Sequence, residues 1–328
     1  MRDIHEEFDR AIGLYLHGRA TEAAEIGRRL LARSRGTPHA ASIHRQVAEF
    51  LHAGGAYEEA RQLAREAGSL ARATRQPGEG LAAALVELAC TLYEGQIGLT
   101  HKQLEEIERF AGGHPEPLAF KAELALLVGQ LDAAQEAVAG ALGKLDDLAP
   151  CGRDPMADLL RIKMLHIAAR ARLLEDQPGE ALALLDRALA LDSPSPIPDL
   201  LGRALVGLAL VRTGETAMGR EYISAAPLAA RPYSADVHGR CLAVAGLAHL
   251  DLEEPGIAAE QLRSASGLLT HPIERQEVYW NLGMLVRDCD DKEEAIGSFR
   301  QATEPGTDTL FGRRAVRALR ELLGLRVV

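Results

Sequence analysis

Side chains that could carry out chemistry are thinly spread along this 328-residue sequence. It holds 11 histidines, yet none lies in an HExxH pattern, and no GxSxG, P-loop or calcium-loop pattern is present. His39 and His44 are five residues apart and do not share a helical face, and His166 stands alone. The neighbouring carboxylates Glu105 and Glu106 are typical of a solvated helix face. We therefore expect no catalytic residues, no metal ligands and no enzymatic activity.

Two further patterns in the sequence bear on cofactor or redox chemistry. The stretch "GEGLAA", residues 78–83, matches a loose dinucleotide-binding pattern, but "ARATRQP" precedes it instead of a β-strand. The four cysteines are far apart and form no CxxC pair, so neither a zinc site nor a disulfide framework is expected. We predict free thiols, no cofactor and a reducing, cytoplasmic location. The cysteines are Cys90, Cys151, Cys241 and Cys289.

The composition indicates a large helical core and argues against two classes of partner. Hydrophobic residues make up 47% of the chain and aromatic residues only 4%, and alanine and leucine, both strong helix formers, dominate. The net charge of −10 lacks the basic footprint that broad nucleic-acid binding needs, so we expect no nucleic-acid partner. No apolar run approaches the roughly 20 residues of a membrane span, and "MRDIHEEFDR" is no signal peptide.

A polar turn recurs along the chain at intervals of about 34 to 47 residues. An apolar-periodic segment, helix A, precedes each turn, and a second such segment, helix B, follows it. This spacing is typical of stacked two-helix repeats, and it predicts eight A/B pairs over residues 1–304. The turns lie near Gly18, Gly55, Gly95–Gly98, Gly129, Asp176, Gly214, Glu253 and Asp290.

Small residues recur at fixed points in both kinds of helix. Helix B alternates small and large side chains, as in Ala295, Phe299 and Ala302. In the last three A segments a glycine stands at the matching point, although glycine inside a helix costs about 1 kcal/mol relative to alanine. The repetition indicates a packing role in which the missing side chain admits the neighbouring helix. These glycines are Gly207, Gly246 and Gly283.

Residues 277–304 resemble the tetratricopeptide repeat family. Asn281, Leu282 and Gly283 are similar to its helix-A signature, and "EEAI" with Phe299 and Ala302 is similar to its helix-B signature. Residues 179–194 match the helix-B part, whereas the aromatic residue near the start of helix A appears only as Tyr279 in the last repeat. The resemblance covers nearly the whole chain. It implies an all-α, right-handed α-solenoid of about eight helix–turn–helix repeats.

Two stretches interrupt the spacing, and a basic helix ends the chain. Sub-stack breaks are predicted near residues 148–157 or 192–199, either as hinges or as long turns, and we favour long turns because the period resumes on both sides. Residues 305–328 contain an amphipathic segment with five arginines outside its apolar face. We expect it to cap the solenoid, as exposed solenoid ends require. A helix that binds a membrane surface or an acidic partner is the alternative.

The resemblance implies that helix A lines the inner surface and that extended peptides or partner segments lie there. Because basic residues are frequent among the inward positions, we expect a partner with an acidic segment, held by arginines. Trp280 is either an apolar anchor in this groove or a residue packed under the cap helix. The predicted partner-binding residues are Arg45, Glu49, Lys163, His166, Arg170, Arg240, Leu247, Trp280, Met284 and Arg287.

The sequence therefore predicts a non-catalytic scaffold or adaptor that binds a protein or peptide in the concave groove. The alternative is a regulatory protein that responds to a ligand or peptide and switches a partner effector. Family members that clamp acidic chaperone tails use paired asparagines, and this chain has the single asparagine Asn281, so that role is not expected. A receptor for peptide pheromones is disfavoured for the same reason but stays open. The sequence does not specify the partner, the pathway or the oligomeric state.

Overall fold

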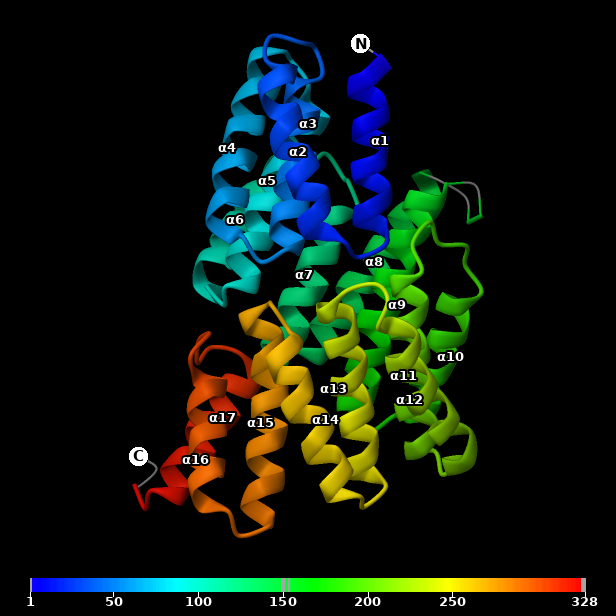
Figure 1. Cartoon of the computed structure of the whole chain (residues 1–328), viewed down its shortest axis with the longest axis vertical. Coiled ribbons are helices and arrows are strands. Elements are labelled where there is room, and N and C mark those ends of the chain that lie inside the picture. The colour runs from blue at the N-terminus through cyan, green and yellow to red at the C-terminus, as the bar shows by residue number, and fades with distance from the viewer. Residues whose placement is uncertain (1, 149–150, 153, 326–328) are drawn as a thin grey trace. The chain divides into compact units, whose positions relative to one another are not determined.

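The computed structural model describes residues 2–148, 151–152 and 154–325, and in this part of the chain every regular element is an α-helix (Figure 1). The all-α helical-repeat class predicted from the sequence is confirmed. Consecutive helices form eight pairs, followed by a single last helix. They are α1 (Arg2–Leu16) and α2 (Ala20–Ser34); α3 (Ala40–Ala53) and α4 (Tyr57–Ala73); α5 (Pro77–Tyr93) and α6 (Ile97–Phe110); α7 (Glu116–Leu127) and α8 (Leu131–Leu148); α9 (Pro155–Leu174) and α10 (Pro178–Leu189); α11 (Ile197–Arg212) and α12 (Thr216–Ala230); α13 (Ala235–Asp251) and α14 (Pro255–Leu268); α15 (Pro272–Asp288) and α16 (Lys292–Thr303); and α17 (Leu310–Leu322).

The chain divides into two compact units, Met1–Pro117 and Leu118–Val328, here called unit 1 and unit 2. The division falls in the first turn of α7. Neither stretch that interrupts the sequence period coincides with it, and both lie inside unit 2, where α8 contacts α9 and α10 contacts α11. Residues 149–150 and 153 of the first stretch lie outside the described residues. Helix contacts therefore continue across both proline-containing connections.

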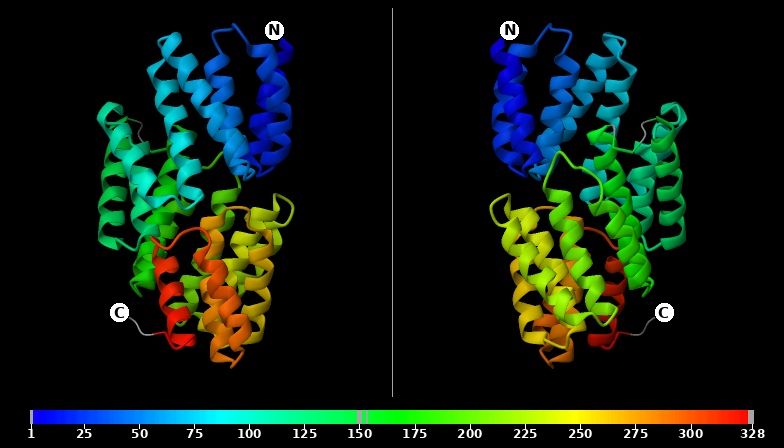
Figure 2. Two further views of the ribbon diagram at one scale, coloured as in Figure 1. Left: turned by 90° about the vertical axis from the view of Figure 1, so that its left-hand side faces the viewer. Right: turned by 90° about the vertical axis from the view of Figure 1, so that its right-hand side faces the viewer.

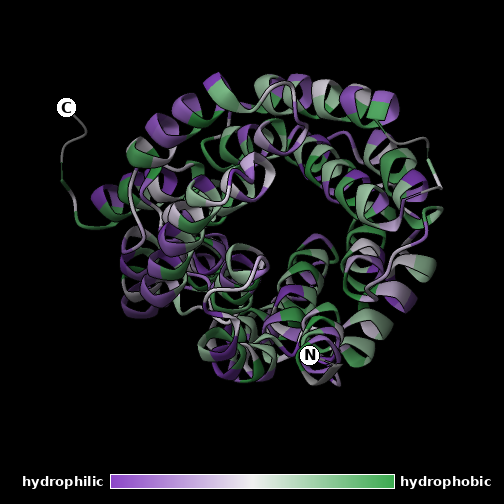
Figure 3. Ribbon diagram, turned by 90° about the horizontal axis from the view of Figure 1, so that it is seen from above, coloured by the Kyte–Doolittle hydropathy of each residue, from purple (hydrophilic) through white to green (hydrophobic). Residues whose placement is uncertain are grey.

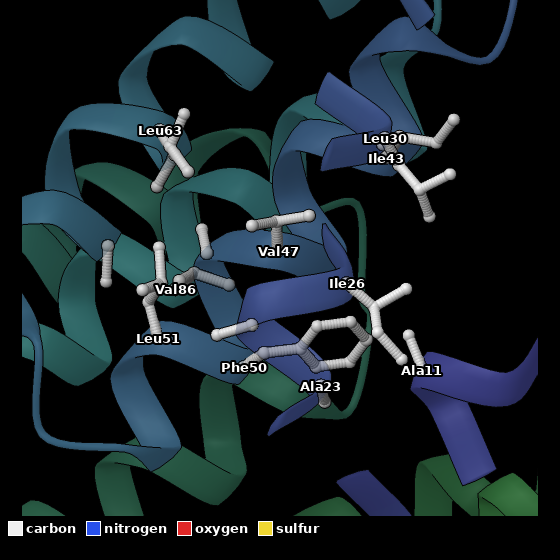
Figure 4. Close-up of a cluster of buried hydrophobic side chains, with 14 of the residues drawn as sticks. Ala11, Ala23, Ile26, Leu30, Ile43, Val47, Phe50, Leu51, Leu63 and Val86 are labelled. Atoms are coloured by element: carbon white, nitrogen blue, oxygen red, sulfur yellow. The ribbon is translucent and has the colours of Figure 1, made fainter. Parts of the chain in front are cut away.

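In unit 1 each helix packs against the next along the chain, and α3 also contacts α5, the first helix of the following pair. The core between these helices is apolar and is filled by side chains from α2, α3 and α4, among them Leu30, Val47 and Phe50, which are fully buried (Figure 4). The opposite helix faces carry charge, and several helices show hydrophilic and hydrophobic residues along their length (Figure 3). This amphipathic pattern is what drives isolated helices into pairs.

The turn between the two helices of every pair has the same backbone geometry. Its second residue has φ between +57° and +90°, the left-handed conformation, and in all eight pairs the next residue donates its N–H to a carbonyl five residues back. In the second pair, for example, Ala56 N–H bonds Leu51 O at 2.9 Å, and Gly55 N–H bonds His52 O at 2.9 Å. This is the Schellman ending of a helix. It explains why the sequence repeats its glycines at these points.

The glycines inside helix A have the packing role that the sequence predicted. A Cβ atom at Gly283 would lie 2.7 Å from the Phe299 ring, and one at Gly207 would lie 2.6 Å from Ile223 Cγ2. Each large side chain belongs to the helix B of the same pair and is fully buried. Close approach of the two helices therefore depends on the absent side chain.

In unit 2 consecutive helices from α8 to α17 pack against one another, α7 and α8 share an apolar cluster, and α17 packs on α15 and α16 (Figure 2). Thr309 is the N-terminal cap residue of α17, and its hydroxyl oxygen accepts the Gly312 N–H at 3.0 Å. The start of α17 also meets the α7–α8 turn: Arg313 donates to Val128 O at 2.6 Å, and Leu310 lies against Gly129. The last helix of unit 2 therefore contacts the first turn of the same unit.

Among the described residues, no helix combines the length and the apolar character that crossing a membrane requires.

Candidate partner-binding surface

The ten predicted partner-binding residues all lie on the first helices of pairs, but they fall in both units. Arg45 and Glu49 are on α3 of unit 1. The other eight are in unit 2: Lys163, His166 and Arg170 on α9, Arg240 and Leu247 on α13, and Trp280, Met284 and Arg287 on α15. Two of the ten residues therefore belong to unit 1 and eight to unit 2.

In unit 1, Arg45 joins two carboxylates on neighbouring first helices. It pairs with Glu49 on its own helix at 2.6 Å and with Glu79 on α5 at 2.7 Å, and its side chain is only 14% exposed. Burial raises the pKa of the Glu49 carboxyl above its usual range, and the attraction of Arg45 opposes that rise. Arg45 is thus neutralised by the protein itself and holds α3 to α5.

In unit 2, Arg240 has the same bridging role between α13 and α15. Its guanidinium pairs with Asp236 on α13 at 2.9 Å and with Glu274 on α15 at 3.1 Å. Burial raises the pKa of the Glu274 carboxyl to about 7, and Arg240 opposes the rise. At this contact two carboxylates therefore face one guanidinium.

Two further ion pairs connect the first helices of unit 2. Lys163 on α9 pairs with Glu123 on α7 at 2.7 Å and lies 5.1 Å from the centre of the Phe120 ring. Arg170 on α9 pairs with Glu277 on α15 at 2.8 Å, although 107 residues separate them in sequence. Helices α9 and α15 therefore come close together inside unit 2.

The expectation of a locally basic groove is wrong. Each basic residue of the predicted set that lies in these pairs has at least one carboxylate partner, so its charge is already balanced within the protein. These residues are Arg45, Lys163, Arg170 and Arg240. The prediction failed because it counted the basic inward positions without the acidic positions of neighbouring first helices.

His166 is wedged between helices. Its Nε2 lies 2.9 Å from the point that a Cβ on Gly202 of α11 would occupy, and this nitrogen is buried without a hydrogen-bond partner. Burial lowers the pKa of the imidazole to about 4, and the nearby positive charge of Arg170 adds to the shift. The ring is therefore neutral at neutral pH, and its environment is one of helix packing.

Trp280 contacts the cap helix. Its ring lies 5.5 Å from the Phe311 ring of α17, centre to centre, and the Arg314 guanidinium lies 5.2 Å from the Trp280 ring centre. Leu247 and Met284 are half-buried at the edges of apolar clusters, and Arg287 pairs with its neighbour Asp288 at 2.9 Å. Of the two roles left open for Trp280, the contact under the cap is the one the structure describes.

Sequence reasoning missed the acidic partners of these basic residues, although the register showed that acidic residues lie on the same helix face. Arg240 precedes the packing glycine Gly246 by six residues, and Glu277 precedes Gly283 by the same interval. Charged residues at that register face the same side of their helices.

Among the described residues one group also brings three metal-binding atoms within 4.8 Å of one another, namely Asp236, His271 and Glu274.

No family model matches the sequence, and no curated protein matches it. The structure, however, is similar to several solved structures. The APC/C hetero-tetramer Cut9–Hcn1 contains a chain that matches with a TM-score of 0.60 and 14% identity, over 96% of this chain and 54% of that one. The Rap conjugation gene regulator of plasmid pLS20, in complex with the Phr* peptide, matches with a TM-score of 0.51 and 12% identity, over 99% of this chain and 77% of that one.

The protein has a tetratricopeptide-repeat fold. The present chain spans about half the length of the chain that it matches in Cut9–Hcn1. At this identity the likeness establishes the fold alone.

A third match corrects the expected partner class. The human IFIT1 dimer with m7Gppp-AAAA has a TM-score of 0.50 and 16% identity, over 95% of this chain and 69% of that one. A tetratricopeptide-repeat fold is thus found with a capped oligonucleotide, so the exclusion of nucleic-acid partners was wrong. Net charge describes the whole chain, whereas binding depends on the charge of one surface.

Proposed function

We propose that this tetratricopeptide-repeat protein is a non-catalytic scaffold that binds a protein or peptide segment through the first helices of unit 2. The observation that carries the proposal is the set of ion pairs that joins α7, α9, α13 and α15. These pairs, here called the lining, are Lys163–Glu123, Arg170–Glu277 and Arg240–Glu274. The cationic members on α9 are half-exposed: the side chains of Lys163 and Arg170 keep 41% and 42% of their accessible surface. A partner can therefore reach them.

These pairs can accept a partner without being broken. The cations of Lys163 and Arg170 reach solvent, while Glu123 and Glu277 are only 14% and 24% exposed and hold them in place. The lining offers donors at Lys163, Arg170 and Arg240 and acceptors at Glu123 and Glu277. A peptide presents both kinds of group along its backbone and side chains. Rigid helices hold the lining in place, which limits the entropy lost on binding.

The solved neighbours support this reading at the level of fold. Cut9 and Hcn1 form a hetero-tetramer, and the Rap regulator is in complex with a peptide. All four cysteines of the present chain are free. This supports placement in a reducing compartment such as the cytoplasm.

A peptide library displayed on phage provides the test. We expect peptides selected by the full chain to bind at least about tenfold more weakly to the Lys163→Ala/Arg170→Ala variant, which corresponds to about 1.4 kcal/mol. Arg300→Ala on α16 is the matched control, because Arg300 is an exposed cation on the second helix of a pair, and binding to it should not change. Equal affinity for all three proteins, with native circular dichroism, contradicts the proposal.

The alternative function, a regulator that responds to a ligand, is favoured by a separate observation. Arg170 with Glu277, and Arg313 with Val128 O, hold together parts of unit 2 that are 107 and 185 residues apart. A ligand that displaced the Arg170–Glu277 pair would alter the spacing between α9 and α15. Hydrogen exchange at α17 distinguishes the two functions: a scaffold predicts no change when peptide binds, and a regulator predicts faster exchange.

A further inference from the structure

Three groups capable of binding a metal ion meet where α13 and α15 begin. Asp236 lies in the first turn of α13, His271 immediately precedes α15, and Glu274 lies in the first turn of α15. Their nearest ligand atoms, one imidazole nitrogen and two carboxylate oxygens, all lie within 4.8 Å of one another. His271 is 3% exposed, and the side chains of Asp236 and Glu274 are 14% and 22% exposed. The group is thus enclosed by protein yet open to solvent at the carboxylates.

The sequence builds this arrangement locally. Pro272 starts α15 and makes His271 its N-terminal cap residue, so His271 and Glu274 stand three residues apart at the helix start and face the same side. Asp236 is held from outside: its Oδ1 accepts both the backbone N–H and the hydroxyl of Thr270, each at 2.9 Å. Hydrogen bonds of this kind orient carboxylates that bind metals.

One oxygen of the group accepts no hydrogen bond. Glu274 pairs with Arg240 through Oε1, while Oε2 is buried without a hydrogen-bond partner. Buried carboxylate oxygens are normally paired. Beside an imidazole and a second carboxylate, this oxygen can serve as a ligand for a cation.

Arg240 lies at the same place and is compatible with a cation. Its guanidinium approaches Asp236 Oδ2 and Glu274 Oε1, which leaves Glu274 Oε2 untouched. Each carboxylate oxygen has two lone pairs, so Asp236 Oδ2, which pairs with Arg240, can still bind a metal, whereas Oδ1 already accepts two hydrogen bonds.

We propose that Asp236, His271 and Glu274 form a binding site for a divalent metal ion of the zinc class. One nitrogen and two oxygens suit Zn²⁺, whereas Ca²⁺ and Mg²⁺ prefer oxygen ligands alone. Three protein ligands leave a coordination position for water or for a group of a bound partner. The ion joins α13 to α15, two of the helices that carry the proposed partner-binding lining. Sequence spacing gave no sign of it because Asp236 is 35 residues from His271.

Isothermal titration of the full chain with Zn²⁺, after treatment with a chelator, tests the site. We expect one ion per chain with a micromolar or tighter Kd, at least tenfold weaker binding to Glu274→Gln and to Asp236→Asn, and no binding of Mg²⁺ under the same conditions. Glu260→Gln is the control: it removes an exposed carboxylate of α14 that does not belong to the group, and its zinc affinity should equal that of the wild type.

Co²⁺ provides a second measurement that does not depend on the stability of any variant. Its visible absorption should show a low-symmetry site with nitrogen and oxygen ligands and no thiolate charge-transfer band. The proposal is overturned if the wild-type chain binds no stoichiometric Zn²⁺, or if Glu274→Gln and Asp236→Asn bind it as tightly as the wild type. A thiolate band overturns it as well, because the ion would then lie at a cysteine.

Discussion

Units 1 and 2 use glycine in different places. In unit 1 the three turns between paired helices all have glycine at the left-handed position, namely Gly18, Gly55 and Gly95. In unit 2 three of the five corresponding turns have Asp176, Glu253 or Asp290 there instead. The last three helix pairs have glycine at the helix crossing, where it faces Ile223, Leu262 or Phe299. Glycine at the turns thus serves backbone conformation, in unit 1 at all three of them, whereas glycine at the crossings of the last three pairs serves helix packing, and the two uses have different energetic consequences.

The largest effect is expected at the helix crossings of unit 2. Gly283→Ala places a Cβ 2.7 Å from the buried Phe299 ring and should lower the free energy of unfolding by about 1–3 kcal/mol. Gly297→Ala, in the second helix of the same pair, meets no atom within 4 Å and should raise it by about 0.5–1 kcal/mol. Urea unfolding of both variants measures the contrast. Equal shifts in the two variants would mean that Gly283 has no packing role.

The second effect is expected where His166 packs against α11, and it concerns the dependence of stability on pH. Gly202 leaves room for His166, whose pKa burial lowers to about 4, so the unfolded chain, with an ordinary pKa near 6.5, binds the proton more readily. The stabilising effect of the neutral ring is complete above about pH 6.5 and is lost as the pH falls toward 4. Relative to His166→Gln, the wild type should lose about 2–3 kcal/mol over that interval, since the pKa falls from 6.5 to about 4 and one pKa unit corresponds to about 1.4 kcal/mol.

Chemical unfolding at a series of pH values measures this difference. His101→Gln is the control, because His101 is exposed on α6, and its profile should follow that of the wild type. A constant difference in unfolding free energy between the wild type and His166→Gln from pH 7.5 to pH 4.5 would show that folding does not lower the pKa of this imidazole.

The turns should give the smallest effects, with opposite signs in the two units. Gly55→Ala forces a Cβ into the left-handed conformation at φ +80° and should destabilise the protein by about 1 kcal/mol. Glu253→Gly relieves the same strain at φ +57° and should stabilise it by about 0.5 kcal/mol. Asp176→Gly should gain less, because aspartate tolerates this conformation. Thermal unfolding of the three variants would refute the account if Glu253→Gly were the least stable.

The fold could be predicted from the sequence because its determinants are local and repeated. Gly283 and Phe299 recur in register with Gly246 and Leu262, so one period exposed both the helix pairing and the packing. The lining could not be predicted in the same way, since the partner of Arg170 is Glu277, three pairs further on. Register gives the face on which a side chain lies, but the choice of partner depends on how tightly successive pairs curve.

The most direct test of the central claim is hydrogen exchange of the full chain with and without a selected peptide. Binding to the first helices of unit 2 predicts new protection on α9, α13 and α15, and none on α10, α12 and α14. Protection confined to those second helices, or to unit 1, would contradict the account.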